Sequence, residues 1–266
     1  MQHKNIQPFP GAVKDCSSVR LDLCTWPEVE EYLAICKAII VPIGSTEQHG
    51  PTGAIGTDAF TAEAIAIELA RRTGVLVTPV QSFGMAEHHL GFPGTMSLRP
   101  STLIQVIKDL VLSLAKNGFE KIYFVNGHGG NIATVKSAFH EVYSSALNQK
   151  ITSASSLRCK IASWFLFKEV SNYANNLYGN LEGQHATPSE ISLTLYLHPT
   201  LMKKQKPLPS PPLCGPINNF QDFRFNHPDG RMGSDPFLAK PNHGKLFLDM
   251  AVNALIDDLS NFLNYD

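Results

Sequence analysis

The chain has 266 residues, of which 43% are hydrophobic and 17% charged, a formal net charge of −1 at pH 7, and five scattered cysteines without a C-x-x-C pair. The lack of a basic stripe disfavours nucleic acid as a partner, the cysteine pattern indicates reduced thiols, and no apolar run approaches the roughly 20 residues that a membrane span requires. With no apolar signal-peptide core near the N-terminus, these features predict a soluble cytoplasmic protein with a sizeable core and no membrane or nucleic-acid partner.

Predicted strands and helices alternate along most of the chain. Short apolar runs predict strands at 38–43, 75–80, 122–125 and 161–165. Helical spacing of apolar residues predicts helices at 58–72, 100–114, 132–142, 188–197 and 244–263. This alternation predicts an α/β protein whose mostly parallel sheet has helices on both faces.

Three segments do not fit the alternation. Residues 81–99 are rich in Gly and Pro and predict a long loop, which inside a compact domain is usually functional. Residues 198–243 predict an irregular arm, whose aromatic residues favour packing on the body or on a neighbouring subunit. The Asn- and Tyr-rich stretch 171–181 is either a lid over the site or a surface loop. Because no convincing linker or repeat occurs, residues 1–266 are predicted to form a single domain.

The first chemical motif, GSTEQHGP at 44–51, directly follows the predicted strand 38–43. In extended backbone, residues two apart point to the same side, so Glu47 and His49 can reach the same small volume. Asp58 follows at a predicted helix start, where a plain helix cap is an equally good interpretation. Oxygen and nitrogen ligands of this mix suit zinc, manganese or iron, and they are too rich in nitrogen for a calcium cage.

The second motif, NGHGGN at 126–131, directly follows the predicted strand 122–125. Glycines permit a sharp turn and a close approach of the backbone to a ligand, and a strand-to-helix turn of this kind can also cradle a phosphate. Neither GxGxxG nor GxxxxGK[ST] is present. We therefore favour His128 as a metal ligand over a phosphate loop.

The third motif, HATPSE at 185–190, lies at the start of the predicted helix 188–197. Taken alone, Glu190 can simply complement the helix dipole, and His185 can be a surface histidine. All three motifs, however, fall at the end of a strand or the start of a helix, where open α/β sheets bind ligands. This coincidence predicts a two-metal hydrolytic centre, whose ligands are Glu47, His49, Asp58, His128 and Glu190. A fourth segment, 84–95, is interpreted as a wall on the substrate side or a subunit contact rather than a source of ligands.

In their order and spacing, these motifs resemble those of the creatininase (creatinine amidohydrolase) family. The matching pieces are GSTEQHGP with GTDAF, EHHLGFPGT, NGHGGN, HATPSE and the late GRMGSDP, and they span roughly residues 38–260. The resemblance implies a three-layer αβα sandwich with a binuclear metal centre, in a closed homo-oligomer that is often a hexamer. It also implies metal-ligand roles for Glu47, His49, Asp58 and His128, with Asp58 bridging, and an active-site role for His185.

Some positions depart from the family pattern. Creatininase itself resembles a G-H-Y-E-N pattern in which the Glu is a ligand, whereas Gly130 stands at that position here. Relatives that share the GHGGN form imply that Glu190 completes the site. Thr52, Thr187 and Ile191 also differ from common family residues, and these changes leave open whether the substrate is creatinine, another cyclic amide, a formamide or a peptide.

The ligands and the resemblance together predict an enzyme that hydrolyses a C–N bond of a small amide, cyclic or open. Two divalent cations, Zn and/or Mn or alternatively Fe, would activate water, and His185 would pass a proton to the leaving nitrogen. Two alternatives stay open: a catalytically idle protein that keeps the metal for structure, and a nucleotide-binding module that uses the NGHGGN turn.

Overall fold

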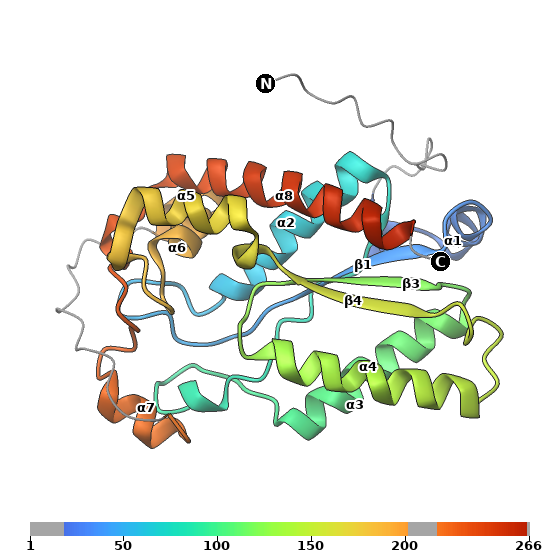
Figure 1. The fold of residues 1–266 in the computed structure, drawn as a ribbon, viewed down its shortest axis with the longest axis horizontal. Coiled ribbons are helices and arrows are strands. Elements are labelled where there is room, and N and C mark those ends of the chain that lie inside the picture. Colours follow the sequence, from blue (N-terminus) through green and yellow to red (C-terminus); the bar gives the residue numbers. More distant parts are fainter. Residues whose placement is uncertain (1–18, 202–216, 265–266) are drawn as a thin grey trace.

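A four-stranded parallel sheet with the strand order β2–β1–β3–β4 forms the centre of the protein (Figure 1). The computed structural model describes residues 19–201 and 217–264. The strands are β1 (Ala38–Ile43), β2 (Leu76–Val77), β3 (Lys121–Asn126) and β4 (Arg158–Ser163). Because Ile43 pairs with Asn126, β1 and β3 end level with each other, and the loops that follow them leave from the same edge. The predicted α/β class with a parallel sheet is confirmed.

Helices cover both faces of the sheet, which makes three layers (Figure 1). On one face lie α2 (Thr57–Thr73), α5 (Lys168–Tyr178), α6 (Pro188–Leu197) and α8 (Pro241–Leu263). On the other lie α3 (Pro100–Lys116) and α4 (Asn131–Asn148), and α1 (Trp26–Leu33) packs on this side through Tyr32. Local signals set several boundaries: a proline stands in the first turn of α3, α6 and α8, and α2 ends at Gly74 with φ 75°.

Strand β1 shows how the sheet divides the core into two hydrophobic clusters. Ala38 and Ile40 face α2 and α8, whereas Ile39, Val41 and Ile43 face α3 and α4. This follows from the two-residue period of a strand. Because helices cover both faces, every β1 residue is buried, and the strand appears in the sequence as an unbroken apolar run rather than an alternating one.

Several predicted boundaries differ from the observed ones. The strand predicted at 75–80 is only Leu76–Val77. The N–H of Thr78 still donates to the carbonyl of Ile40, but the next bond to β1 comes from Gln81, three residues later, so the regular two-residue alternation of the pairing is broken. The strand predicted at 161–165 lies at Arg158–Ser163. The surface-loop interpretation of 171–181 is wrong, since most of that stretch belongs to α5 and Tyr178 is buried. Helix α1 was not predicted.

The prediction of an irregular arm at 198–243 is wrong in part. It contains a short helix, α7 (Phe220–Asn226), and α8 begins at Pro241 rather than at Gly244. Asn219 starts α7 by accepting hydrogen bonds from the N–H groups of Gln221 and Asp222. Phe223 is fully buried against the ring of His89, so this part of the arm packs on the body. Residues 202–216, which include the Pro-rich stretch 207–212, lie outside the described residues.

Two features of composition can also be checked against the structure. Cys24, Cys36 and Cys159 are free thiols, as the sequence predicts. Within residues 19–201 and 217–264, no helix combines the length and the apolar character that a membrane crossing demands.

Candidate metal centre

The loop between β1 and α2 carries Glu47, His49 and Asp58. The N–H of Glu47 donates to the carbonyl of Ile55 at 2.9 Å, and Gly50 turns the chain with φ 63°. This folds the loop back on itself, so that Asp58 enters the first turn of α2 beside the other two. All three side chains are almost completely buried. The carboxylate of Asp58 faces histidine rings instead of the N–H groups of its own helix, so the cap interpretation does not describe it.

The loop between β3 and α4 presents His128 to these carboxylates. Asn126 donates to the carbonyl of His128 at 2.7 Å, and Asn131 bridges two other loops by donating to Gly44 O and accepting from the N–H of Met85. A Cβ at Gly130 would lie 2.4 Å from His128 Nε2, so the glycine leaves room for this ring. The polar side chains of the motif hold the protein's own loops together, which favours the metal-ligand hypothesis over a phosphate cradle.

The start of α6 supplies Glu190 and follows His185. Glu190 Oε1 accepts from the N–H of Thr187 at 2.6 Å, which completes a capping box. Its other oxygen, Oε2, lies 3.8 Å from His49 Nε2. This geometry is compatible with both interpretations of Glu190, because one carboxylate oxygen caps the helix while the second faces the candidate site. His185 is buried just before the helix, and Ser234 donates to its carbonyl oxygen at 2.5 Å.

The five predicted ligands converge in two groups. The ligand atoms of Glu47, Asp58 and His128 lie within 4.8 Å of one another, and those of His49, Asp58 and Glu190 do the same. Asp58 belongs to both groups: Oδ1 is 3.0 Å from His49 Nε2, and Oδ2 is 3.1 Å from His128 Nδ1. This arrangement suits two cations that share the Asp58 carboxylate.

In His49 and His128, one ring nitrogen faces a backbone carbonyl and the other faces the carboxylates of the site. The contact of the first, outer nitrogen shows whether the second, inner nitrogen is free to bind a cation. His49 Nδ1 lies 3.1 Å from Glu47 O, and His128 Nε2 lies 2.9 Å from Met85 O. A carbonyl oxygen only accepts, so these nitrogens carry the ring protons. In the neutral rings the inner nitrogens then point bare lone pairs at carboxylates. Two acceptors at this distance need a proton or a cation between them, and a carbonyl behind the ring is the usual second partner of a metal-bound histidine.

Unpaired oxygens provide the second test of whether a metal fits. Glu47 Oε1, Glu47 Oε2 and Asp58 Oδ2 are buried and accept no well-formed hydrogen bond from any described residue. A buried carboxylate without partners is unfavourable by several kcal/mol. Divalent cations would satisfy these oxygens, and carboxylate with imidazole is a donor set that suits zinc, manganese or iron. The residues present therefore fit the implied metals.

The electrostatics of the metal-free site favour protons where cations would sit. Burial lowers the pKa of His49, but Asp58 and Glu190 outweigh this effect and raise the pKa to about 10. Burial also opposes charge on His128, yet Glu47 and Asp58 raise its pKa well above the ordinary value. Burial raises the pKa of Glu190 to about 7 against the attraction of His49. For Asp58, burial is outweighed by the two histidines, which lower its pKa.

These shifts predict that cations displace protons. A histidine with a raised pKa stabilises the metal-free fold while it is protonated, fully below pH 6.5, and loses this contribution as pH rises through about 10. At pH 7 these shifts keep His49 and His128 positively charged and Glu190 partly protonated, so binding of Zn²⁺ should release at least two protons per chain. Affinity should rise with pH across the same window. Titration calorimetry in buffers of different protonation enthalpy measures the release, and binding without proton release would contradict the assignment of these rings.

His89 is the site residue that sequence reasoning missed. From the sequence, 84–95 is interpreted as a wall or a subunit contact rather than a source of ligands, and His89 is given no place beside the candidate ligands. In the structure the ring of His89 is buried there, with Nε2 3.3 Å from Glu47 Oε1. Its ligand atom also forms a third group within 4.8 Å with those of Glu47 and His185. The available signal was a pair of histidines in a long loop. A short 3-10 turn at Glu87–His89 decides which of the two points inward, and that turn left no mark in the sequence pattern.

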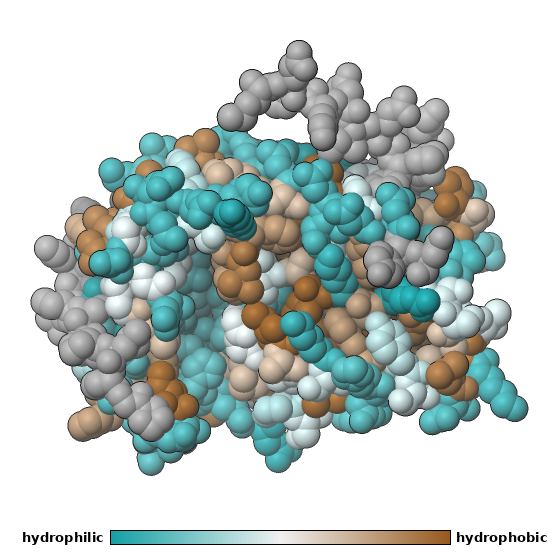
Figure 2. All heavy atoms as spheres, viewed as in Figure 1, coloured by the Kyte–Doolittle hydropathy of each residue, from teal (hydrophilic) through white to brown (hydrophobic). Residues whose placement is uncertain are grey.

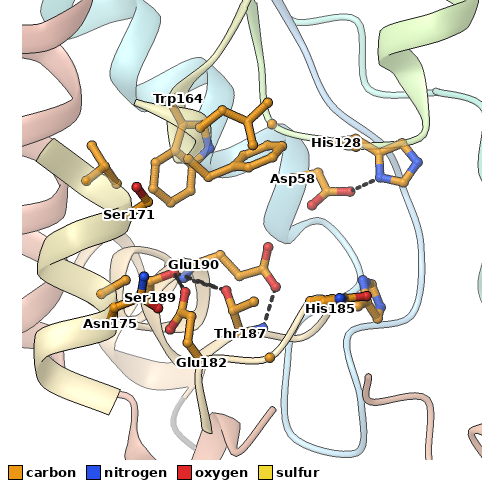
Figure 3. Close-up of a pocket in the computed structure, with 18 residues that line it drawn as sticks. Asp58, His128, Trp164, Ser171, Asn175, Glu182, His185, Thr187, Ser189 and Glu190 are labelled. Atoms are coloured by element: carbon orange, nitrogen blue, oxygen red, sulfur yellow. Dashed lines mark hydrogen bonds and ion pairs between the residues drawn. The ribbon is translucent and has the colours of Figure 1, made fainter. Parts of the chain in front are cut away.

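A cavity of about 350 Å³ opens beside the two groups of candidate metal ligands. In Figure 3, Asp58, His128 and His185 lie on one side of it, Ser171 and Asn175 lie on the other, and Trp164 lies across from Thr187. The apolar part of the wall consists of Trp164, Phe165, Leu166, Val170 and Ala174. Figure 2 shows a hollow with hydrophilic residues inside it on the face seen in Figure 1.

Comparison with known sequences gives a consistent set of relatives. The family model described as creatininase, creatinine amidohydrolase, matches residues 22–259. Creatinine amidohydrolase of Pseudomonas putida is 26% identical over 258 residues, which cover 90% of this chain and 95% of that protein. 3-Dehydro-scyllo-inosose hydrolase of Thermotoga maritima is 33% identical over 114 residues, covering 42% of this chain and 37% of that protein. Mycofactocin precursor peptide peptidase of Mycolicibacterium smegmatis is 37% identical over 106 residues, covering 38% and 42%.

Solved structures show the same fold. A solved structure described as creatininase Mn has a TM-score of 0.82 and 25% identity, covering 93% of this chain and 100% of that one. A crystal structure of creatinine amidohydrolase has a TM-score of 0.83 at 24% identity, covering 94% and 100%. The three-layer arrangement predicted from the sequence is therefore confirmed.

Proposed function

This chain belongs to the creatininase family, and from that membership we propose that it is a metal-dependent amidohydrolase that hydrolyses a C–N bond of a small amide. The observation that carries the proposal is the pair of ligand groups that share Asp58 beside a cavity. The metals that we propose are two divalent cations, Zn and/or Mn, held by Glu47, Asp58 and His128 and by His49, Asp58 and Glu190. When bound, such cations lower the pKa of water and polarise an amide carbonyl.

His185 is proposed to move the proton. Its Nε2 donates to Gln48 O at 2.8 Å, which leaves Nδ1 bare, 3.8 Å from Glu47 Oε1. Burial and the neighbouring His49 lower the pKa of His185 well below its ordinary value, so the ring is neutral near pH 7. A neutral ring that lines the cavity can accept a proton from water at Nδ1 and deliver it to the departing nitrogen.

The cavity supports a small substrate. Its volume of about 350 Å³ lies at the low end of ligand pockets, which range from roughly 300 to 1,000 Å³. The names of the relatives include a small cyclic amide, a cyclic ketone of an inositol and a peptide, so they share hydrolysis and not one substrate. We propose a compact amide of the creatinine, lactam or formamide kind, with a short peptide as the alternative.

Metal analysis followed by a substrate screen tests the function. The purified protein is expected to hold two divalent ions per chain and, loaded with the ion found, to hydrolyse at least one member of a panel of creatinine, other lactams, formamides and dipeptides. Bound metal without hydrolysis of any member would favour the idle binding protein. Phosphate or nucleotide binding that survives chelation would favour the nucleotide module.

The role of His185 gives a separate prediction. His185→Gln should lower kcat by about 10²- to 10⁴-fold, the usual contribution of a general acid–base group, while metal content stays at the wild-type value. His140→Leu, at an exposed position on α4, is the control and should change neither quantity. Loss of an ion from His185→Gln would instead make His185 a ligand.

We also propose a closed homo-oligomer, with a hexamer favoured. Large apolar side chains stand exposed on the described surface, including Trp26, Leu166 and Phe225. Light scattering coupled to size-exclusion chromatography measures the mass, and a monomer of 29.2 kDa would contradict this part of the proposal.

A further inference from the structure

Backbone groups on two loops fix the orientation of the Gln48 amide. Its Oε1 accepts from the N–H of Gly50 at 2.8 Å, and its Nε2 donates to the carbonyl of Gly230 at 2.9 Å. An N–H only donates and a carbonyl only accepts, so the two ends of the amide cannot be exchanged. Gly230 has φ 86°, and a Cβ there would lie 2.1 Å from Gln48 Oε1. The late GRMGSDP motif therefore begins with the glycine that this contact needs.

The second N–H of this amide sets the tautomer of His89. Gln48 Nε2 lies 2.9 Å from His89 Nδ1. Because Gln48 is the donor, Nδ1 accepts and carries no proton, and the single proton of the neutral ring sits on Nε2. That nitrogen lies 3.3 Å from Glu47 Oε1, with both side chains buried.

His185 does not compete for the same N–H. Its Nε2 also lies 2.9 Å from Gln48 Nε2, but it lies 2.8 Å from the backbone oxygen of Gln48 as well. If His185 Nε2 accepted from the amide, it would have no proton for that carbonyl, and two acceptors would meet at 2.8 Å. One arrangement pairs every group: His185 donates to the carbonyl, and the amide donates to Gly230 and to His89.

The hydrogen-bond donor and acceptor nitrogens of His89 are thus reversed relative to those of the two histidines among the candidate ligands. His49 and His128 donate outward to carbonyls and point bare nitrogens inward, whereas His89 accepts on its outer nitrogen and points an N–H inward. A protonated nitrogen cannot bind a cation, although a carboxylate can accept from it. The unpaired oxygens of Glu47 are the acceptors within reach.

We propose that His89 is a positioning residue, locked by Gln48, which presents Nε2–H to the carboxylate of Glu47 and does not bind a third ion with Glu47 and His185. The proposal rests on the proposed metal centre. Second partners of this kind typically change metal affinity by about 10- to 100-fold, because they restrict a ligating carboxylate to its binding orientation.

Two-bond ¹H–¹⁵N NMR of the wild-type protein reads the tautomer directly. The His89 signals are assigned by their loss in His89→Gln, and spectra are recorded with and without Zn²⁺. A proton on Nε2 is expected in both states. A proton on Nδ1, or zinc bound to Nε2, would overturn the proposal. The spectra involve no amide substrate, so failure of the protein to hydrolyse amides would leave this result standing, and the metal-free spectrum decides the matter even if zinc does not bind.

Paired substitutions measure the effect on the metal. His89→Leu removes both polar atoms, while His89→Gln keeps an acceptor for Gln48 and a donor for Glu47. In competition with a chelator, zinc affinity should fall about 10- to 100-fold in His89→Leu and stay within about threefold in His89→Gln. Both variants should still hold the wild-type number of ions at saturating zinc.

The neighbouring histidine offers a matched control. The ring of His88 packs against that of His89, with 4.1 Å between the centroids and 46° between the ring planes, and within the described residues it makes no ion pair with Glu47. His88→Leu should keep wild-type zinc affinity. A tenfold loss in this control would trace the effect to packing and overturn the proposal, as would the loss of one ion per chain from both His89 variants. If His89→Leu does not fold, the wild-type spectra remain the test.

Discussion

Replacing Asp58 by Asn should remove both ions and nearly all hydrolysis. Each oxygen of this carboxylate faces a different histidine, Oδ1 toward His49 and Oδ2 toward His128, so Asp58 serves both ligand groups. An amide keeps the size but loses the charge and offers only one acceptor, so neither cation retains a full set of ligands. We expect kcat/KM to fall on the order of 10³-fold or more, which corresponds to several kcal/mol of lost stabilisation by the cations.

Elemental analysis and steady-state kinetics on the same preparation measure this result. Asp249→Asn is the matched control, since Asp249 on α8 pairs with Arg72 and Lys245 and belongs to none of the ligand groups. The control should keep metal and activity. Two ions per chain in Asp58→Asn would show that the shared carboxylate is not a ligand, and the proposed centre would have to be abandoned.

Replacing Glu190 by Gln should remove one ion and leave the other. Glu190 belongs only to the group with His49 and Asp58, and the group of Glu47, Asp58 and His128 does not depend on it. The substitution tests this role alone, because Gln still completes a capping box with Thr187 and preserves the start of α6. We expect one strongly bound ion per chain and a loss in kcat/KM of about 10²-fold or more.

Helix α1 supplies the control for this substitution. It begins with a capping box of the same kind, formed by Thr25 and Glu28, on an exposed surface. Glu28→Gln repeats the chemical change without a nearby metal group and should leave both ions and the activity in place. If Glu190→Gln also retained two ions, Glu190 would be a capping residue only, and another group would have to complete the second set of ligands.

Much of the ligand set could be predicted because its residues occupy positions with strong local signals. Glu47 and His49 follow an unbroken apolar strand, His128 lies between glycines after another, and Glu190 stands in the first turn of a helix marked by Thr187 and Pro188. In a parallel sheet these positions meet at one edge whatever the details of packing. Local pattern and global topology therefore agree for these residues.

The features that escaped prediction depend on contacts between distant segments. His89 turns inward through a three-residue 3-10 turn, and its neighbour Phe223 comes from a helix more than a hundred residues later. Helix α7 was missed because it is short and its one buried residue packs on that loop. Helix α5 has many Asn and Tyr residues, which are weak helix formers, and it is stabilised by burying Val170, Ala174 and Tyr178.

The candidate ligands come from positions 47 to 190. The group of Glu47, Asp58 and His128 forms only when β1 and β3 pair, and the group of His49, Asp58 and Glu190 forms only when α6 is also in place. An unfolded chain therefore has no comparable affinity, and the free energy of cation binding adds to the stability of the native state, by about 4 kcal/mol for each ion at a free concentration a thousandfold above its Kd. In a cell that runs short of the cation, the protein would lose its catalytic activity and also part of its stability. It would unfold more often, and proteases would degrade it faster.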